Sequence, residues 1–328
     1  MTIDLVAEQS PLGGLERWLH DPAVTEVMVN AGTHVWIERD GSLSEVGTIR
    51  PATLMAAIEH ILAPIGRRLD RSQPMVDARL HDGSRVCAVL PPIAVDGPCL
   101  SIRRFATRRL QLQSFATAPV AHLVRELVQR RCNIVVSGAT SSGKTTLLNC
   151  LAGEVAGDAR IITLEDTAEL RLAHPHVVRL ETRDATPDGV GEVTLGHLLR
   201  VALRLRPDRL VVGEVRGAEA VHLLHALNTG HDGSLATVHA NTAADALNRL
   251  VALVVQAVGN WPLAAVHHEV SGAIDAVVHV ARLPDGTRRI AEVVEVVAPI
   301  GQPGGLAVRT LASGDEVHAA PTRGRVCT

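Results

Sequence analysis

The chain has 328 residues, of which 46% are hydrophobic and 20% charged, a composition typical of a globular protein with room for two domains. Its net charge of −3, with three Trp, two Phe and no Tyr, argues against a general attraction to nucleic acid and against single-strand binding by base stacking. Five cysteines without a C-x-x-C pair argue against a zinc site or a disulfide framework and fit a reducing compartment.

Residues 1–106 are predicted to form a small α+β domain. The N-terminus has no basic segment followed by an apolar run, so we expect no signal peptide and a cytoplasmic protein. Alternating residues and turn signals predict strands, and helical spacing or an early proline predicts helices. In chain order these are a helix at 12–19, strands at 26–30, 34–38 and 43–46, a helix at 51–65, and strands at 75–80, 85–90 and 100–105. Residues 107–118 are polar and are interpreted as a linker with a short helix.

From residue 119 the pattern changes to an alternation of helices and strands, which continues through a second domain at 119–300. This alternation predicts an α/β domain with a mainly parallel sheet and helices on both faces. The predicted helices lie at 120–130, 194–204, 218–227 and 242–255, and the strands at 133–137, 160–164, 176–180, 209–213 and 234–238. The longest apolar stretch, 251–258, is too short to cross a bilayer. Residues 301–328 are rich in Gly, Pro and Ala, and we expect a loosely ordered tail there.

A phosphate-binding loop is predicted between the strand at 133–137 and the helix that follows it. Residues 138–145 read GATSSGKT and fit G-x-x-x-x-G-K-[ST] at every fixed position. Lys144 is the only lysine among 32 basic residues, as expected where a compact ammonium is needed and a planar guanidinium will not serve. The alternative is a chance Gly/Ser-rich turn before a helix. The predicted nucleotide-binding residues are Gly138, Ala139, Thr140, Ser141, Ser142, Gly143, Lys144, Thr145 and Thr146.

Polar clusters follow three further predicted strands, at 165–169, 213–216 and 230–241. Ligands of a parallel sheet bind at the carboxyl ends of its strands, so we expect these clusters near the phosphate loop. Nucleotide hydrolysis needs a metal shell, a carboxylate that orients water, and positive charge, and Glu165 and Glu214 are the candidate carboxylates. The alternatives are that Glu165 or Asp166 caps a following helix, and that Glu214 forms a salt bridge with Arg216 or another arginine.

Together these stretches resemble the type II/type IV secretion ATPase family. The phosphate loop, Glu165-Asp166, Glu214, and the pair His231 and His239 follow one another in the family's order and approximate spacing. In the first domain, residues 82–86, 91–92 and 101–105 resemble the branch that drives tight-adherence (Flp-type) pili and the conjugal-transfer-associated motors. The resemblance implies a RecA-like P-loop domain preceded by a PAS-like domain. Ser141 stands where many relatives have glycine, which implies a tighter or slower loop.

The resemblance also implies roles for single residues. Lys144 and Thr145 would hold the phosphates and Mg²⁺ of bound ATP, with Glu214 on the metal or its waters. Glu165 would orient the attacking water and His239 would sense the γ-phosphate, while His231 is more easily read as structural. ATP would bind in the cleft between the two domains, where the first domain supplies three candidate arginines, Arg85, Arg103 and Arg104.

The implied assembly is a cytoplasmic homo-oligomeric ring, commonly a hexamer, coupled to an inner-membrane platform protein, with no direct contact to nucleic acid. The leading hypothesis is therefore an Mg²⁺-dependent ATPase that powers pilus assembly or type II/IV secretion. Three alternatives remain open: a conjugation-type motor of the same fold, a DNA-acting motor, and a regulatory subunit that binds nucleotide without turnover. DNA-stimulated hydrolysis with a steep salt dependence would favour the second of these.

Overall fold

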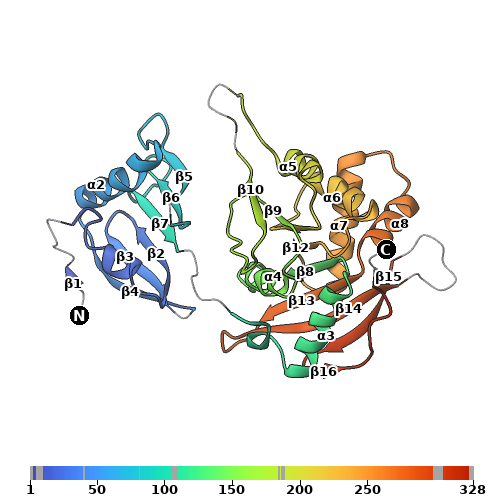
Figure 1. The fold of residues 1–328 in the computed structure, drawn as a ribbon. Helices are drawn as coiled ribbons and strands as arrows, with labels where there is room; N and C mark the ends of the chain where they lie inside the picture. The colour runs from blue at the N-terminus through green and yellow to red at the C-terminus, as the bar shows by residue number, and fades with distance from the viewer. Residues whose placement is uncertain are drawn as a thin grey trace. The chain divides into compact units, whose positions relative to one another are not determined.

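The structure is a computed structural model that describes residues 3–4, 10–39, 41–80, 82–104, 110–183, 185, 189–297 and 306–324. The chain divides into two compact units, Met1–Arg109 and Leu110–Thr328. Each unit has its own sheet, of seven strands in the first and nine in the second. Figure 1 shows the elements of both units.

The first unit is a mostly antiparallel sheet in the order β1-β4-β3-β2-β7-β6-β5, with short helices against one face. Apolar residues alternate along its strands, and Val27, Val35 and Ile102 are buried with Leu54 and Ile58 of the helix α2. The strands predicted from alternation are confirmed, although Phe105, the last residue of the strand predicted at 100–105, lies outside the described residues. The elements are β1 (Ile3–Asp4), α1 (Glu16–Leu19), β2 (Val24–Asn30), β3 (His34–Arg39), β4 (Ser42–Thr48), α2 (Pro51–Leu62), η1 (Ala63–Ile65), β5 (Met75–Arg79), β6 (Arg85–Val89) and β7 (Cys99–Arg103).

The second unit is a mixed sheet in the order β10-β9-β11-β12-β8-β13-β14-β15-β16. Its strands from β10 to β13 are parallel, and the last three are antiparallel. The elements are η2 (Leu112–Ser114), α3 (Ala118–Gln129), β8 (Ile134–Gly138), α4 (Lys144–Gly153), β9 (Ile161–Glu165), β10 (Val177–Glu181), α5 (Leu195–Ala202), η3 (Leu203–Leu205), β11 (Arg209–Val212), α6 (Glu219–Asn228), β12 (Leu235–His239), α7 (Ala243–Val258), α8 (Leu263–Ala273), β13 (Ala276–Arg282), β14 (Arg288–Val297), β15 (Ala307–Ser313) and β16 (Glu316–Val317).

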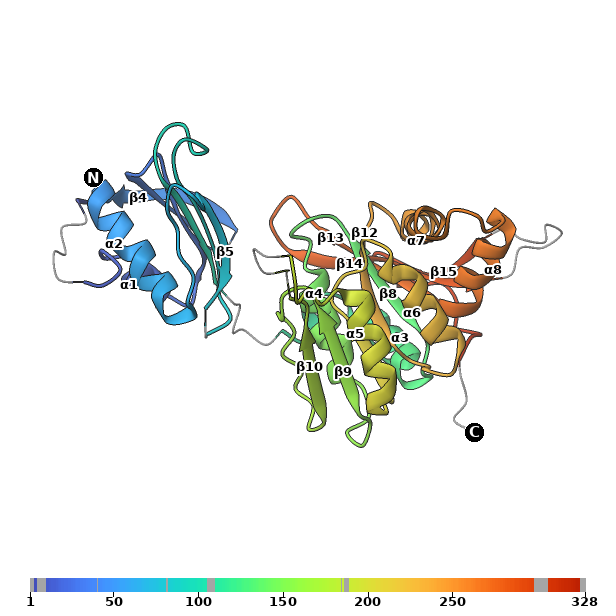
Figure 2. The same ribbon diagram turned by 90° about the horizontal axis from the view of Figure 1, so that it is seen from above.

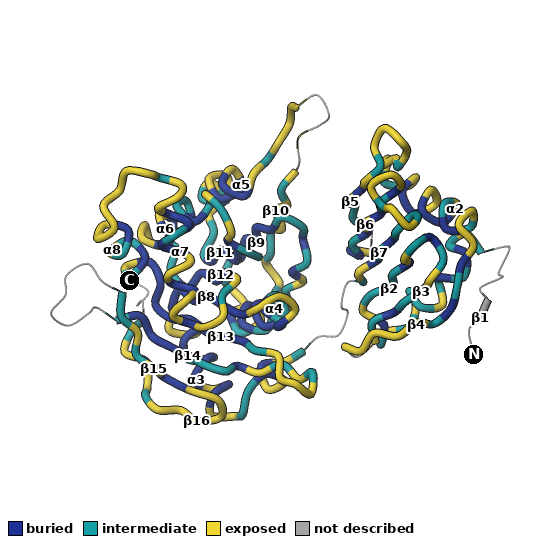
Figure 3. Tube along the Cα trace, turned by 180° about the vertical axis from the view of Figure 1, so that it is seen from behind, coloured by how far each residue is buried: buried dark blue, intermediate teal, exposed yellow. Residues whose placement is uncertain are grey.

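Helices cover both faces of this second sheet, as the alternation predicts. One hydrophobic cluster joins the sheet to α5, α6, α7 and α8, and a second joins it to α3 and α4. The central strands are buried on both faces, because successive residues such as Ile134, Val135 and Val136 enter the two clusters in turn. Figure 2 shows the helices around the sheet from above, and Figure 3 shows the central strands as the most buried part of the unit.

The expectation of a loose tail after residue 300 is wrong for its described part, 306–324. Strand β15 pairs with β14, and β16 pairs with β15. The residues that follow β16 are held by Glu295 of β14. Its carboxylate is fully buried and accepts hydrogen bonds from the backbone N–H groups of Thr322 and Arg323 at 2.7 and 2.6 Å. A buried carboxylate needs such hydrogen-bond donors. Composition alone cannot reveal that residues 306–324 pair with β14, because the contacts join distant parts of the chain.

Within the described residues no helix is both long enough and apolar enough to span a membrane.

Candidate functional site

The phosphate loop lies where the sequence predicts it, between the end of β8 at Gly138 and the start of α4 at Lys144. Two of its glycines have steric reasons to be glycine. A Cβ at Gly138 would lie 2.4 Å from the backbone oxygen of Val280, and a Cβ at Gly143 would lie 2.7 Å from Cδ of Arg288. Gly143 also has φ +99°, which favours glycine. The loop is therefore a close-fitting backbone turn directly before a helix N-terminus, the geometry that binds phosphate.

Lys144 is held across this loop. The residue is 8% exposed, and its Nζ donates to the carbonyl oxygens of Gly138 and Ala139 at 3.1 and 2.9 Å. Burial lowers the pKa of Lys144, and the nearby Glu214 carboxylate opposes that shift. Phosphate oxygens are charged acceptors and bond an ammonium more strongly than neutral carbonyls do. The N–H groups of Lys144 Nζ could therefore exchange the two carbonyl oxygens for those of a phosphate.

His239 and Glu214 meet Lys144 at the carboxyl edge of the sheet. His239 ends β12 and pairs in register with Gly138 of β8. Its Nε2 lies 3.2 Å from Nζ of Lys144 and 3.4 Å from Oε1 of Glu214. Burial is the largest cause of the lowered pKa of His239, followed by the Lys144 charge. The structure thus brings together three of the residues that the sequence predicts for the site.

Glu165 ends β9 and is 2% exposed. Its Oε2 accepts hydrogen bonds from the backbone N–H groups of Glu169 and Leu170, at 2.7 and 2.8 Å. Its Oε1 is buried and has no hydrogen-bond partner within the described part of the chain. Burial raises the pKa of Glu165 to about 7. Gly213 gives the side chain room, because a Cβ there would lie 2.9 Å from Cγ of Glu165. A buried polar atom without a partner calls for an explanation such as a functional role.

The segment after Glu165 returns to the phosphate-loop helix. The backbone N–H of Arg171 donates to Oδ1 of Asn149 in α4 at 3.0 Å, and Leu170 is buried with Leu147 and Leu151 of the same helix. No helix begins within residues 166–176, all of which the structure describes. The alternative that Glu165 caps a helix is therefore not realised, although its carboxylate does fix a backbone turn.

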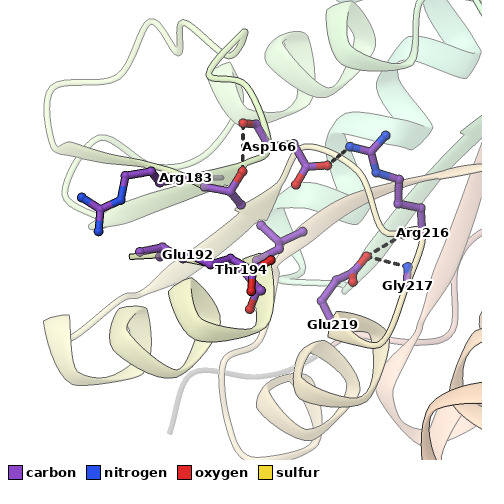
Figure 4. A pocket seen from close by; sticks show the side chains of 10 residues that line it. Asp166, Arg183, Glu192, Thr194, Arg216, Gly217 and Glu219 are labelled. Carbon is purple, nitrogen blue, oxygen red and sulfur yellow. Dashed lines mark hydrogen bonds and ion pairs between the residues drawn. The ribbon is translucent and has the colours of Figure 1, made fainter. Parts of the chain in front are cut away.

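Arg216 pairs with Asp166, whereas the described ion pair of Glu214 is with His239. The alternative of a salt bridge from Glu214 to Arg216 is thus not what the structure contains. A pocket of about 230 Å³ opens beside Asp166 and Arg216, between the start of α5 and the start of α6. Figure 4 shows Asp166 and Arg216 turned toward each other, with Arg183 pointing away from them.

His231 lies at the opposite edge of the sheet from His239, because it precedes β12 rather than ending it. The five residues of β12 place the two edges roughly 17 Å apart. Nδ1 of His231 lies 3.1 Å from the carbonyl oxygen of Ala226, in the last turn of α6. The expectation that the whole cluster at 230–241 gathers at the carboxyl edge is therefore wrong for its first half.

The first unit carries the three candidate arginines on or next to two neighbouring strands. Arg85 of β6 lies opposite Arg103 of β7, and Arg79 of β5 lies opposite Arg85. Arg79, Arg85 and Arg103 thus form a row. The row lies on the sheet face away from the buried core, since these arginines alternate with buried residues such as Val86. Arg79 is not among the residues predicted for the site from the sequence, although its place in the hairpin partner strand of Arg85 is a usable signal.

Arg104 is held differently. Its Nη1 donates to the backbone oxygens of Asp21 and Val24, the latter at 2.9 Å. It ties the end of β7 to the turn before β2 within the first unit.

The chain matches known proteins along most of its length. The family model described as type II/IV secretion system protein matches residues 8–322. A Mycobacterium tuberculosis protein whose name assigns it provisionally to conjugal transfer is 43% identical over 302 residues, covering 88% of this chain and 85% of that protein. The conjugal transfer protein TrbB of Rhizobium radiobacter is 38% identical, covering 85% of each. The type IV secretion system protein PtlH of Bordetella pertussis is 34% identical, covering 85% of this chain and 91% of PtlH.

Solved structures share the fold. The pilus retraction motor PilT with bound ADP aligns with a TM-score of 0.63 at 21% identity, covering 93% of this chain and 83% of PilT. The ATPase DotB of Legionella pneumophila aligns with a TM-score of 0.61 at 22% identity, covering 90% and 82%.

Proposed function

Because the chain belongs to the type II/IV secretion system protein family, we propose that it is a Mg²⁺-dependent ATPase that powers type IV secretion or pilus assembly. The observation that carries the proposal is the phosphate loop with Lys144 poised over it and with His239 and Glu214 beside the Lys144 ammonium. The names of the relatives favour conjugal transfer or type IV secretion as the machinery that the motor serves.

In this proposal the phosphates of ATP bind to the backbone N–H groups of residues 139–146, and Lys144 turns from the loop carbonyls to the β- and γ-phosphates. Glu165 orients the attacking water through the oxygen that has no partner within the described residues. His239, next to Lys144, responds to the presence of the γ-phosphate. Each of these roles uses only a hydrogen bond or a charge, which is what phosphoryl transfer requires.

The residues present suit Mg²⁺. The Thr145 hydroxyl and the Glu214 carboxylate are oxygen donors, which this ion prefers, and ATP phosphates and water supply the remaining ligands. Glu214 is 33% exposed beside the loop, so its carboxylate is accessible to an ion. When bound, Mg²⁺ neutralises charge that develops on the phosphates.

We further propose that the first unit is a PAS-like domain and the second a RecA-like domain, and that the first unit supplies positive charge to the phosphates. Arg85 and Arg103 are the preferred donors, because they share the row with Arg79, whereas Arg104 is engaged with backbone carbonyls. An arginine of this kind is worth roughly 10³- to 10⁵-fold in rate. The active form would be a cytoplasmic homo-oligomeric ring that docks on an inner-membrane platform protein.

Steady-state ATP hydrolysis across a series of protein concentrations tests the proposal. We expect turnover per chain to rise with concentration as rings assemble, and to vanish in Lys144→Ala. Lys144→Arg is the charge-preserving comparison, since it replaces the compact ammonium by a planar guanidinium. We expect this variant to lose turnover as well. Binding of ATP without turnover at every concentration would favour the regulatory-subunit alternative instead.

A further inference from the structure

Two loops at the carboxyl edge of the second sheet are tied to each other by one ion pair. Asp166 directly follows Glu165 at the end of β9, and Arg216 lies two residues after Glu214, beyond β11. Nη2 of Arg216 contacts Oδ2 of Asp166. Figure 4 shows that the pair spans the gap between the two loops at the rim of the pocket. It therefore joins the segments that carry the two carboxylates of the proposed site.

The segment around Glu214 leaves the sheet at Gly213, whose backbone N–H donates to the carbonyl oxygen of Leu164 in β9 at 2.8 Å. Beyond this point it is fixed mainly on the side of β12. Thr237 donates its hydroxyl to the carbonyl oxygen of Gly213 at 2.5 Å, and the backbone N–H of Val215 donates to the carbonyl oxygen of Thr237 at 2.9 Å. Oε1 of Glu219 then accepts from the backbone N–H groups of Arg216 and Gly217, each at 2.7 Å. These contacts hold the segment to β12 and α6, but none of them reaches the loop after β9.

The loop after β9 has its own anchors. The hydroxyl of Thr182 donates to the carbonyl oxygen of Asp166 at 3.0 Å, and the backbone N–H of Thr182 donates to the carbonyl oxygen of Glu165, also at 3.0 Å. Gly213 packs against the Glu165 side chain from the other side. Past the end of the β9–β11 pairing, the Asp166–Arg216 pair is the charged contact between the two loops within the described residues.

The exposure of the pair indicates what it is for. The side chains of Arg216 and Asp166 are 61% and 32% exposed, and pairs this exposed contribute little to folding stability. We propose that Arg216 and Asp166 are positioning residues that hold the loop carrying Glu214, beyond the end of the paired strands, in place relative to Glu165. This inference rests on the proposed ATPase function, because it assigns the pair a role through those two carboxylates.

The test compares ATP hydrolysis by the full-length protein with Arg216→Gln, Asp166→Asn and the double variant. A second double variant, Asp166→Arg with Arg216→Asp, restores the pair with its charges exchanged. Arg183→Gln is the matched control, since Arg183 lines the same pocket but donates its Nε to the carbonyl oxygen of Gly191. Affinity for a non-hydrolysable ATP analogue and the melting temperature are measured for every variant.

We expect each single variant to lower kcat about 10- to 100-fold, as small misplacements of catalytic groups do. Analogue affinity and melting temperature should stay at the wild-type values. The neutral double variant should lose no more than either single variant, because both remove one interaction, and the charge-exchanged variant should regain part of the rate. Arg183→Gln should match wild type.

Wild-type kcat in both single variants, or losses that multiply in the double variant, would overturn the inference alone. Loss of analogue binding in step with activity would do the same, since it would indicate a damaged site rather than misplaced carboxylates. A wild-type chain without Lys144-dependent turnover would overturn the proposed function, and the inference with it.

Discussion

Replacing Glu165 by glutamine should stabilise the folded protein at alkaline pH. The carboxylate lies at the end of β9, 2% exposed, with one oxygen on two backbone N–H groups and the other without a partner in the described structure. Glutamine keeps an acceptor for the two N–H groups and removes the buried charge. The stabilisation is therefore electrostatic and must depend on pH.

The sign follows from the direction of the shift. Burial raises the pKa of Glu165 from 4.5 to about 7, so between these values the folded chain binds more protons than the unfolded chain, and stability falls as pH rises. At pH values well above 7 the stabilisation that comes from this raised pKa is lost completely. From pH 5 to pH 8.5 this amounts to about 2–3 kcal/mol. The glutamine variant does not titrate, so its advantage over wild type should grow by that amount.

Urea denaturation at pH 5 and pH 8.5, without nucleotide, measures this difference directly. Glu181→Gln is the matched control, because Glu181 of β10 lies opposite Glu165 in register and is exposed. We expect no pH-dependent advantage for the control. A free-energy difference between Glu165→Gln and wild type that is equal at the two pH values would refute the reasoning, since it would mean that Glu165 titrates normally when folded.

Three further substitutions test the loop and the carboxy-terminal segment. Ser141→Gly should stabilise the protein by about 1 kcal/mol, because Ser141 has φ +60°, where a Cβ is unfavourable; an unchanged urea midpoint would contradict this. Gly143→Ala should cost about 1–3 kcal/mol and weaken ATP-analogue binding, with wild-type affinity as the opposing result. Glu295→Ala should cost about 1–3 kcal/mol and speed proteolysis near residues 322–323, and unchanged cleavage there would show that the carboxylate does not hold the segment.

The phosphate loop could be predicted from the sequence because its chemistry is local. The glycines, Lys144 and the flanking strand and helix lie within about twenty consecutive residues, and the structure places them as expected. His239 was also predictable, since it directly ends an apolar strand and parallel strands bring their carboxyl ends together. The same rule failed for His231 because the boundary of β12, at Leu235, decides which edge a neighbouring residue occupies.

Features that depend on distant pairing were not predictable. The expected order of elements stopped at residue 255, whereas α8, β13 and β14 follow it and β15 and β16 complete the sheet. The pairing of Arg216 with Asp166 rather than with Glu214 depends on side-chain direction in two loops, which spacing along the chain does not specify.

In the proposed mechanism Glu165 serves the hydrolysis of ATP rather than its binding, and the two roles can be separated by experiment. Single-turnover ATP hydrolysis and ATP affinity are determined side by side for wild type and Glu165→Gln. We predict unchanged affinity and a rate lower by roughly 10²- to 10⁴-fold, the range expected when a general base is removed. Hydrolysis by the variant at the wild-type rate would contradict this role and would assign Glu165 to the fold alone.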